Sequence, residues 1–193
     1  IYVADEVAEA FADELVARAE GFKIGSGLDP DVDLGPMFSR AQRVKTREHV
    51  ADALEKGAEL LSGGREPEGE AYEKGYFFLP TVLCRADHKM KVMREETFGP
   101  VAPLMKFKSL EEAISLANDS PYGLAAYIFT SDLKTALKAA EGLEAGGIGV
   151  NVNNVVDLQA PFGGWKESGV GRELGRWGLE AYMETKHIRM GMG

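Results

Sequence analysis

The stretch from Val101 to Val152 alternates between strand-like and helix-like patterns, and this alternation limits the possible folds more than any other feature. Apolar runs rich in strand-favouring residues occupy 101–107, 124–129 and 148–152, and helical patterns fill the intervals at 110–117 and 133–143. Helices of this length between strands are the crossovers that join parallel strands. We therefore predict an α/β fold with a mostly parallel sheet.

Two amphipathic helices are predicted before this region. In the first, over residues 7–19, apolar side chains recur at every fourth position, and Asp5 and Gly21 are placed to cap its start and end. The second follows Ser39, an N-cap type of residue, and carries apolar residues on or near one face. Gly63-Gly64 ends a short strand-like run, residues 65–74 read as a surface loop, and residues 75–83 read as an apolar strand.

The composition favours one globular domain and excludes several classes of partner. The chain has 193 residues, of which 45% are hydrophobic and 27% charged. With 22 basic and 31 acidic residues its net charge is -9, which repels phosphate backbones and anionic lipid, so we expect neither nucleic acid nor a membrane surface as a partner. No apolar run approaches the roughly 18 residues of a membrane span.

Cysteine and histidine usage indicates a reducing compartment and no metal site. The single cysteine, Cys84, excludes an internal disulfide, so we expect a cytoplasmic protein. The three histidines, His49, His88 and His187, are far apart and show no metal-ligand spacing. We predict that they lie on the surface or on helix faces.

An acidic motif, Arg94 to Pro100, lies between two apolar runs and therefore on a connection, where binding groups usually lie. A carboxylate accepts hydrogen bonds only, so Glu95 or Glu96 could take both vicinal hydroxyls of a ribose, and Phe98 offers an apolar face to a flat ring. The alternative is a solvated helix end followed by a core phenylalanine. These residues alone leave both interpretations open.

The whole chain resembles the NAD(P)-dependent aldehyde dehydrogenase superfamily, and the resemblance corresponds to the C-terminal part of such an enzyme. The motifs that carry it, in the family's order, are Ile1-Tyr2-Val3, Leu34-Gly35-Pro36, Gly75-Tyr76-Phe77 with Pro80-Thr81-Val82, Glu95-Glu96-Thr97-Phe98-Gly99-Pro100, residues 118–124 and residues 161–169. The resemblance implies a three-layer catalytic (aldehyde-binding) domain over residues 1–182 that lacks its N-terminal start. It also implies an oligomerisation strand within residues 183–193 of a dimer or tetramer, and places the nucleotide-binding domain outside this chain.

The resemblance also implies roles for individual residues. Glu96 matches the residue that binds the nicotinamide ribose of NAD or NADP, and Phe98 lies beside the nicotinamide; Gln42 and Lys45 match positions on a helix that reaches toward this ribose. Phe162 and Val156 are candidates to line the aldehyde tunnel, and Glu173 matches an acid that relays protons in some members. Gln42, Lys45 and Glu173 could equally be solvated surface residues, and Val156 could belong to the core.

The family oxidises an aldehyde to a carboxylic acid through a cysteine thiohemiacetal and thioester. Its nucleophile lies in a Gly-Gln-x-Cys motif that this chain lacks, so we expect Cys84 to be a packing residue and the chain alone to be inactive. Because Ile1-Tyr2-Val3 reads as the inside of a strand, we interpret the chain as a fragment. The alternative is a non-catalytic binding or oligomerisation module.

Two glycine-rich stretches were tested against nucleotide-binding motifs. Residues 146–149 lack the third glycine of the dinucleotide fingerprint at the required offset, and residues 169–175 follow no apolar strand. We therefore predict that these glycines serve loop geometry. The lone C-terminal run 183–190 reads as a strand without an obvious partner in the chain.

Overall fold

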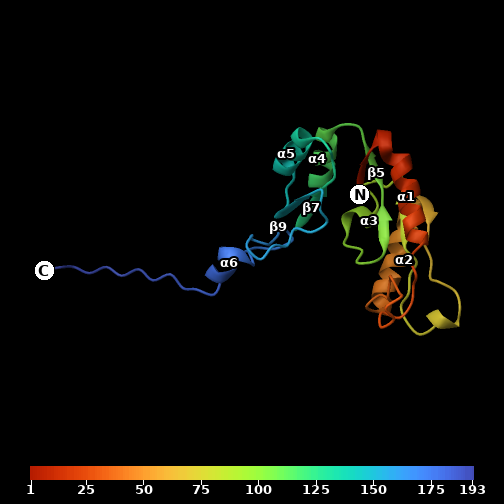
Figure 1. Ribbon diagram of the computed structural model, residues 1–193, viewed down its shortest axis with the longest axis horizontal. Coiled ribbons are helices and arrows are strands. Elements are labelled where there is room, and N and C mark those ends of the chain that lie inside the picture. Colours follow the sequence, from red (N-terminus) through yellow and green to blue (C-terminus); the bar gives the residue numbers. More distant parts are fainter. The chain divides into compact units, whose positions relative to one another are not determined.

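A computed structural model describes all residues, 1–193, and divides them into two compact units, Ile1–Ser109 and Leu110–Gly193 (Figure 1). The composition predicted one domain, whereas each unit has strands and helices of its own. None of the helices combines the length and apolar character that crossing a membrane requires.

The first unit is built around the strand β3 (Thr81–Cys84), which pairs with β4 (Val101–Pro103) in parallel and with β2 (Glu59–Ser62) in antiparallel fashion. A separate parallel pair joins β1 (Tyr2–Ala4) to β5 (Met105–Phe107). The remaining elements of this unit are η1 (Asp5–Val7), α1 (Ala8–Glu20), α2 (Arg40–Glu55), η2 (Glu70–Tyr72) and α3 (Lys91–Arg94).

Leu104 divides the strand that was predicted over residues 101–107. Its backbone N–H donates to Leu83 O at 2.7 Å, and its carbonyl accepts from Ala86 N at 2.9 Å, whereas the next residue, Met105, donates to Ile1 O at 2.9 Å. The chain therefore passes from the pair with β3 to the pair with β1 at this residue. Side-chain alternation does not predict such a change of partner, because the apolar pattern continues through it.

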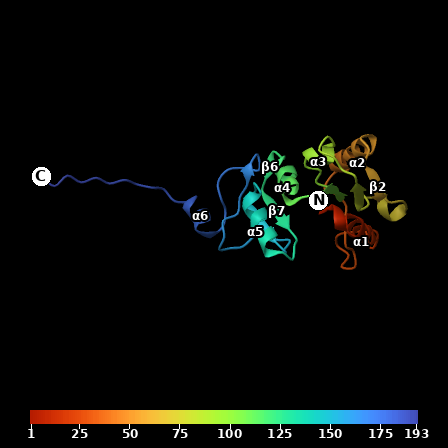
Figure 2. The same cartoon turned by 90° about the horizontal axis from the view of Figure 1, so that it is seen from above.

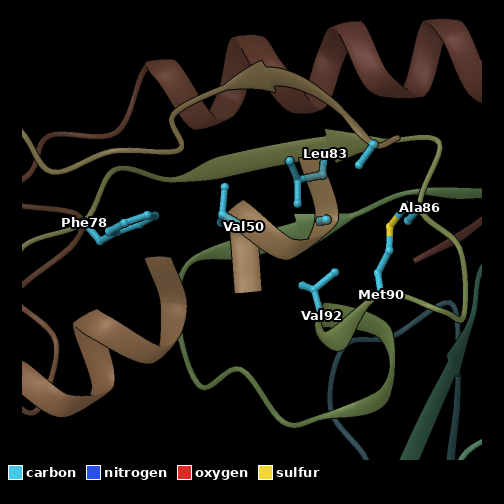
Figure 3. Packing of buried hydrophobic residues seen from close by; sticks show 8 residues of the cluster. Val50, Phe78, Leu83, Ala86, Met90 and Val92 are labelled. Atoms are coloured by element: carbon cyan, nitrogen blue, oxygen red, sulfur yellow. The ribbon is translucent and has the colours of Figure 1, made fainter. Parts of the chain in front are cut away.

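Successive residues of β3 point to opposite faces and belong to different core clusters. Leu83 packs with residues of α2 and α3 that include Val50 and Val92, together with Phe78, Met90 and others (Figure 3). Val82 packs on the opposite side with Val3, Ala8 and Leu104. Helices thus cover both faces of the β3 sheet, and the first unit has three layers, helix, sheet and helix.

Two of the three predicted helix boundaries hold. Ser39 caps α2, with its hydroxyl accepting from Gln42 N at 3.2 Å, and Gly21 is the C-cap of α1. The prediction for Asp5 is wrong, because Asp5 lies in the 3-10 turn η1 and α1 begins three residues later with no side-chain cap. The predicted strand over residues 75–83 is also too long, since only its end from Thr81 is paired.

The second unit contains the predicted β-α-β crossover. β7 (Ala125–Ile128) and β8 (Gly147–Val150) pair in parallel, and α5 (Leu133–Gly142) connects them; Asp132 caps α5 by accepting from Thr135 N at 2.8 Å. α4 (Leu110–Asn118) lies beside α5, as Figures 1 and 2 show. A short antiparallel pair, β6 (Tyr122–Gly123) with β9 (Trp165–Lys166), and α6 (Gly175–Glu180) complete the unit.

The strands form four small sheets and not the single sheet that was predicted. Three of the five strand pairs are parallel, in agreement with the prediction of mostly parallel pairing, and β2-β3-β4 is a mixed sheet. Residues 183–193 contain no strand or helix in the single chain and are exposed (Figure 1). Pairing of this segment at the edge of its own sheet, one alternative for it, therefore does not occur.

Candidate active site

The acidic motif forms a loop between α3 and β4, and one face of α2 holds its backbone. The side-chain amide of Gln42 donates to the carbonyl oxygens of Thr97 and Phe98, the latter at 3.1 Å, and Lys45 Nζ donates to the carbonyl of Glu96 at 2.6 Å. Residues three apart share a helix face, so both donors reach the same loop. The structure thus brings together Gln42, Lys45, Glu96 and Phe98.

Phe98 has a strained backbone and an exposed ring. Its φ of 50° lies in the left-handed region, which costs a non-glycine residue about 1–2 kcal/mol. The ring is 75% exposed, so the interpretation of Phe98 as a core residue is wrong. The hydrogen bond from Gln42 to the Phe98 carbonyl helps to hold this conformation, and such strain is concentrated at functional sites.

The glycine after Phe98 permits close approach to α2. A Cβ atom at Gly99 would overlap the hydroxyl oxygen of Thr46, which is completely buried and donates to Gln42 O at 3.0 Å. The loop therefore packs directly on the helix, and only glycine fits there.

Glu96 presents a free carboxylate. Its side chain is exposed and has no hydrogen-bond or ion-pair partner within the chain, although its backbone carbonyl is held by Lys45. Glu95 is also exposed, and it is the C-cap residue of α3, so the acidic pair does follow a helix end. A carboxylate that no protein group occupies can accept two hydrogen bonds from a ligand diol.

Sequence reasoning missed His49. It lies on a face of α2, one of the two alternatives predicted for the histidines, but only 2% of it is exposed and no role in the site was predicted for it. Its Nδ1 lies 3.0 Å from Thr97 Oγ1 and its Nε2 lies 3.3 Å from Glu95 Oε2. The available signal was its position four residues after Lys45 and seven after Gln42, which places all three on one face of α2.

The other predicted site residues belong to the second unit. The backbones of Phe162 and Glu173 form an antiparallel bridge, with N–H to O distances of 2.8 and 2.7 Å. Phe162 is half-buried, and the Glu173 side chain is exposed. Val156 is 51% exposed, so it is not a core residue. The structure groups no three histidine, cysteine or acidic side chains around a common metal position.

Cys84 is the last residue of β3 and is half-buried. Its thiol donates to Glu59 Oε2 at 3.3 Å. Burial, and secondly the hydrogen bond and charge of Glu59, raise the pKa of Cys84 above its ordinary value. Because the thiolate is the nucleophile, this environment disfavours covalent catalysis by Cys84.

We expect Cys84 in the folded protein to react slowly with iodoacetamide. A raised pKa means that the thiolate forms, and alkylation accelerates, at a higher pH than for an unperturbed thiol. Mass spectrometry of the alkylated protein over a pH series tests this, with the urea-unfolded protein as the reference. A folded protein that reacts faster than the unfolded one at neutral pH would contradict the assignment of Cys84 as unreactive.

The amino-acid sequence matches the aldehyde dehydrogenase family over residues 1–188. The chain belongs to this family. Among curated relatives, 3-sulfolactaldehyde dehydrogenase of Pseudomonas putida is 46% identical over 192 residues, an alignment that covers 99% of this chain and 38% of the relative. The NADP(+) succinate-semialdehyde dehydrogenase GabD of Escherichia coli K12 is 43% identical over 193 residues, which are 100% of this chain and 39% of the relative.

Solved aldehyde dehydrogenase structures share the fold. Betaine aldehyde dehydrogenase from Staphylococcus aureus in complex with NAD+ superposes with a TM-score of 0.93 at 40% identity, covering 97% of this chain and 37% of that one. Succinate-semialdehyde dehydrogenase from Burkholderia pseudomallei gives 0.88 at 43% identity, covering 94% and 37%. The chain therefore spans under two fifths of the length of these aldehyde dehydrogenases.

Proposed function

We propose that this chain is the C-terminal part of an enzyme that oxidises an aldehyde to a carboxylic acid with NAD(P)+. Residues 1–182 would contribute to the catalytic domain and residues 183–193 to an oligomer interface, with the nucleotide-binding domain and the nucleophilic cysteine in the rest of the protein. The family match supports the proposed aldehyde oxidation, and the loop over residues 95–100 is the observation that carries the proposal for this chain. The Glu96 carboxylate of this loop is free, and α2 holds the loop backbone.

The residues of this loop fit a nicotinamide nucleotide. The free Glu96 carboxylate suits a ribose diol, and the exposed Phe98 ring suits the flat nicotinamide. Gln42 and Lys45 already donate to the loop carbonyls, so their first contribution is to hold the loop. When bound, the nicotinamide supplies the hydride acceptor for oxidation of the substrate.

The substrate class that we propose is a small aldehyde, because the relatives named above are dehydrogenases of sulfolactaldehyde, succinate semialdehyde and betaine aldehyde. Phe162 and Val156 are proposed to line its binding site. Their partly exposed side chains are compatible with this role. Glu173 is proposed as a proton relay, since its exposed carboxylate lies on the strand-like pair with Phe162.

Assay of the full-length protein with NAD+ or NADP+ and a panel of these aldehydes tests the proposed function. We expect aldehyde-dependent formation of NAD(P)H, measured by absorbance, and no turnover by residues 1–193 alone. The isolated chain is the control, because its only cysteine is the unreactive Cys84. Turnover by the isolated chain that Cys84→Ser abolishes would contradict the placement of the nucleophile elsewhere. A native protein of 20.9 kDa without activity would favour a non-catalytic module.

The C-terminal segment supports the proposal of a dimer or tetramer. Its apolar side chains and those of the preceding helix α6 are about half exposed or more: Trp177, Leu179, Tyr182, Met183, Ile188, Met190 and Met192. Exposed apolar surface of this kind marks interaction sites. Strand formation by residues 183–190 would then require the edge of another subunit's sheet.

We expect truncation of the full-length protein after Tyr182 to convert the oligomer to monomers or aggregates. The truncation removes the segment proposed to form a strand with another subunit, together with the apolar side chains of that segment. Sedimentation velocity measures the change, and a variant that lacks only Gly193 is the control, because it keeps every apolar side chain of the segment. An unchanged oligomer after truncation at Tyr182 would show that the tail takes no part in assembly.

A further inference from the structure

We infer that His49 is a positioning residue, which fixes the conformation of the loop Glu95–Phe98 and thereby keeps the Glu96 carboxylate free for the cofactor. The inference rests on the proposed function for the role of Glu96. Its structural part concerns His49, Glu95 and Thr97 alone, and these residues lie in the first unit.

His49 is buried under the loop and both of its ring nitrogens face loop side chains. Nδ1 lies 3.0 Å from Thr97 Oγ1, and Nε2 lies 3.3 Å from Glu95 Oε2. A carboxylate cannot donate a hydrogen bond, so the Nε2 proton faces Glu95. In the neutral imidazole Nδ1 then accepts a hydrogen bond from the Thr97 hydroxyl, which keeps its proton. No buried side-chain nitrogen or oxygen in the chain lacks a partner, so this pairing is complete.

The spacing of these contacts explains why Glu96 is free. Glu95 has an extended backbone, with φ -110° and ψ 145°. Along an extended segment successive side chains point to opposite sides. Glu95 and Thr97 both point to His49, and the Glu96 side chain between them has no hydrogen-bond or ion-pair partner in the chain. One buried imidazole thus sets which of the two adjacent carboxylates is engaged and which is available.

Three side chains on the same face of α2 bind the loop. Gln42, Lys45 and His49 follow one another at helical spacing of three and four residues, and they bind the loop at Phe98, Glu96 and Thr97. Gln42 and Lys45 bind only backbone carbonyls, which every residue has. His49 contacts side chains of the loop, so it is the contact on this face that depends on the residues at 95 and 97.

Thr97→Val and Thr97→Ser in the full-length protein test the inference. Valine keeps the shape of threonine but removes the hydroxyl, whereas serine keeps the hydroxyl and is the matched control. His49→Phe removes both contacts, and Thr97→Val provides the answer if His49→Phe does not fold. Two quantities are measured: amide hydrogen exchange of residues 95–98 without cofactor, and the Kd for NAD+ and NADP+ by titration calorimetry.

We expect Thr97→Val to exchange about fivefold to tenfold faster at residues 95–98 and to bind the cofactor about tenfold more weakly, as the loss of one buried hydrogen bond implies. Exchange elsewhere and the thermal midpoint should change little, and Thr97→Ser should behave as the wild type. If Thr97→Val matches Thr97→Ser in both measurements, the positioning role of His49 is refuted.

Failure of the proposed function gives a different result. In that case the wild-type protein binds neither NAD+ nor NADP+, and the part of the inference that concerns the cofactor is refuted with it. The exchange comparison between the valine and serine variants still decides whether His49 fixes the loop.

Discussion

Gly146→Ala is expected to lower the free energy of unfolding by on the order of 3 to 4 kcal/mol, near the upper end of single substitutions. A Cβ atom at this position would overlap the carbonyl oxygen of Gly163. That oxygen belongs to the backbone and cannot rotate away as the end of a side chain could. Gly146 N also donates to Gly123 O at 3.0 Å, so the residue cannot retreat without loss of this bond.

Alanine substitutions at two other glycines serve as controls, because neither places a Cβ atom against the backbone. Gly191→Ala, in the exposed tail with no atom near its Cβ, should leave stability unchanged, and Gly169→Ala adds only the cost of a positive φ, about 1 kcal/mol. Urea unfolding followed by circular dichroism measures all three variants. Equal midpoints for Gly146→Ala and Gly191→Ala would show that the Gly163 backbone shifts freely and is not packed as the structure has it.

The packing at Gly146 explains a motif that resembled a nucleotide-binding loop. The run Gly146-Gly147-Ile148-Gly149 was expected to serve loop geometry, but only Gly146 precedes the strand, and the other three residues lie in β8. Gly146 lies against the Gly163 backbone, and Gly149 lies against the ring of Tyr127, where its Cβ would be 2.8 Å from Tyr127 Cδ1. These glycines allow β8 to enter the sheet beside segments that are distant in the sequence.

The sequence predicted correctly those helices and strands whose ends are set by residues close by in the sequence. Ser39 marked the start of α2, and the crossover β7-α5-β8 followed from alternating apolar periods. Long-range pairing was not predictable in the same way. The apolar run around Leu104 gave no sign that it changes partner, and the strand signal over residues 75–80 was not matched by a paired edge.

Contacts between distant parts of the sequence were not predictable in the candidate site either. The helical spacing of Gln42 and Lys45 placed them on one face, but the sequence could not show that a loop more than 50 residues later covers this face. The burial of His49 was not predicted for this reason, since a histidine on a polar helix has no local feature that indicates burial. The left-handed backbone of Phe98 likewise results from contacts with α2 and not from an intrinsic preference of phenylalanine.

Glu96→Gln in the full-length enzyme is expected to raise the Kd of NAD(P)+ or to lower the rate of hydride transfer by about ten- to hundredfold. This range corresponds to the loss of a hydrogen bond to a charged group, about 1.5–3 kcal/mol. The amide keeps the shape of the side chain but replaces one of two strong acceptors with a donor. Folding should be intact, because the carboxylate has no partner within the chain whose loss could destabilise it.

Glu55→Gln is the matched control for this substitution, since Glu55 is an exposed glutamate at the end of α2 and lies outside the loop. Both variants should show the wild-type thermal midpoint, and only Glu96→Gln should change cofactor titration and stopped-flow formation of NAD(P)H. Wild-type affinity and kinetics in Glu96→Gln would mean that the free carboxylate takes no part in cofactor binding. The exposed Phe98 ring and the donors on α2 would then have to account for the binding by themselves.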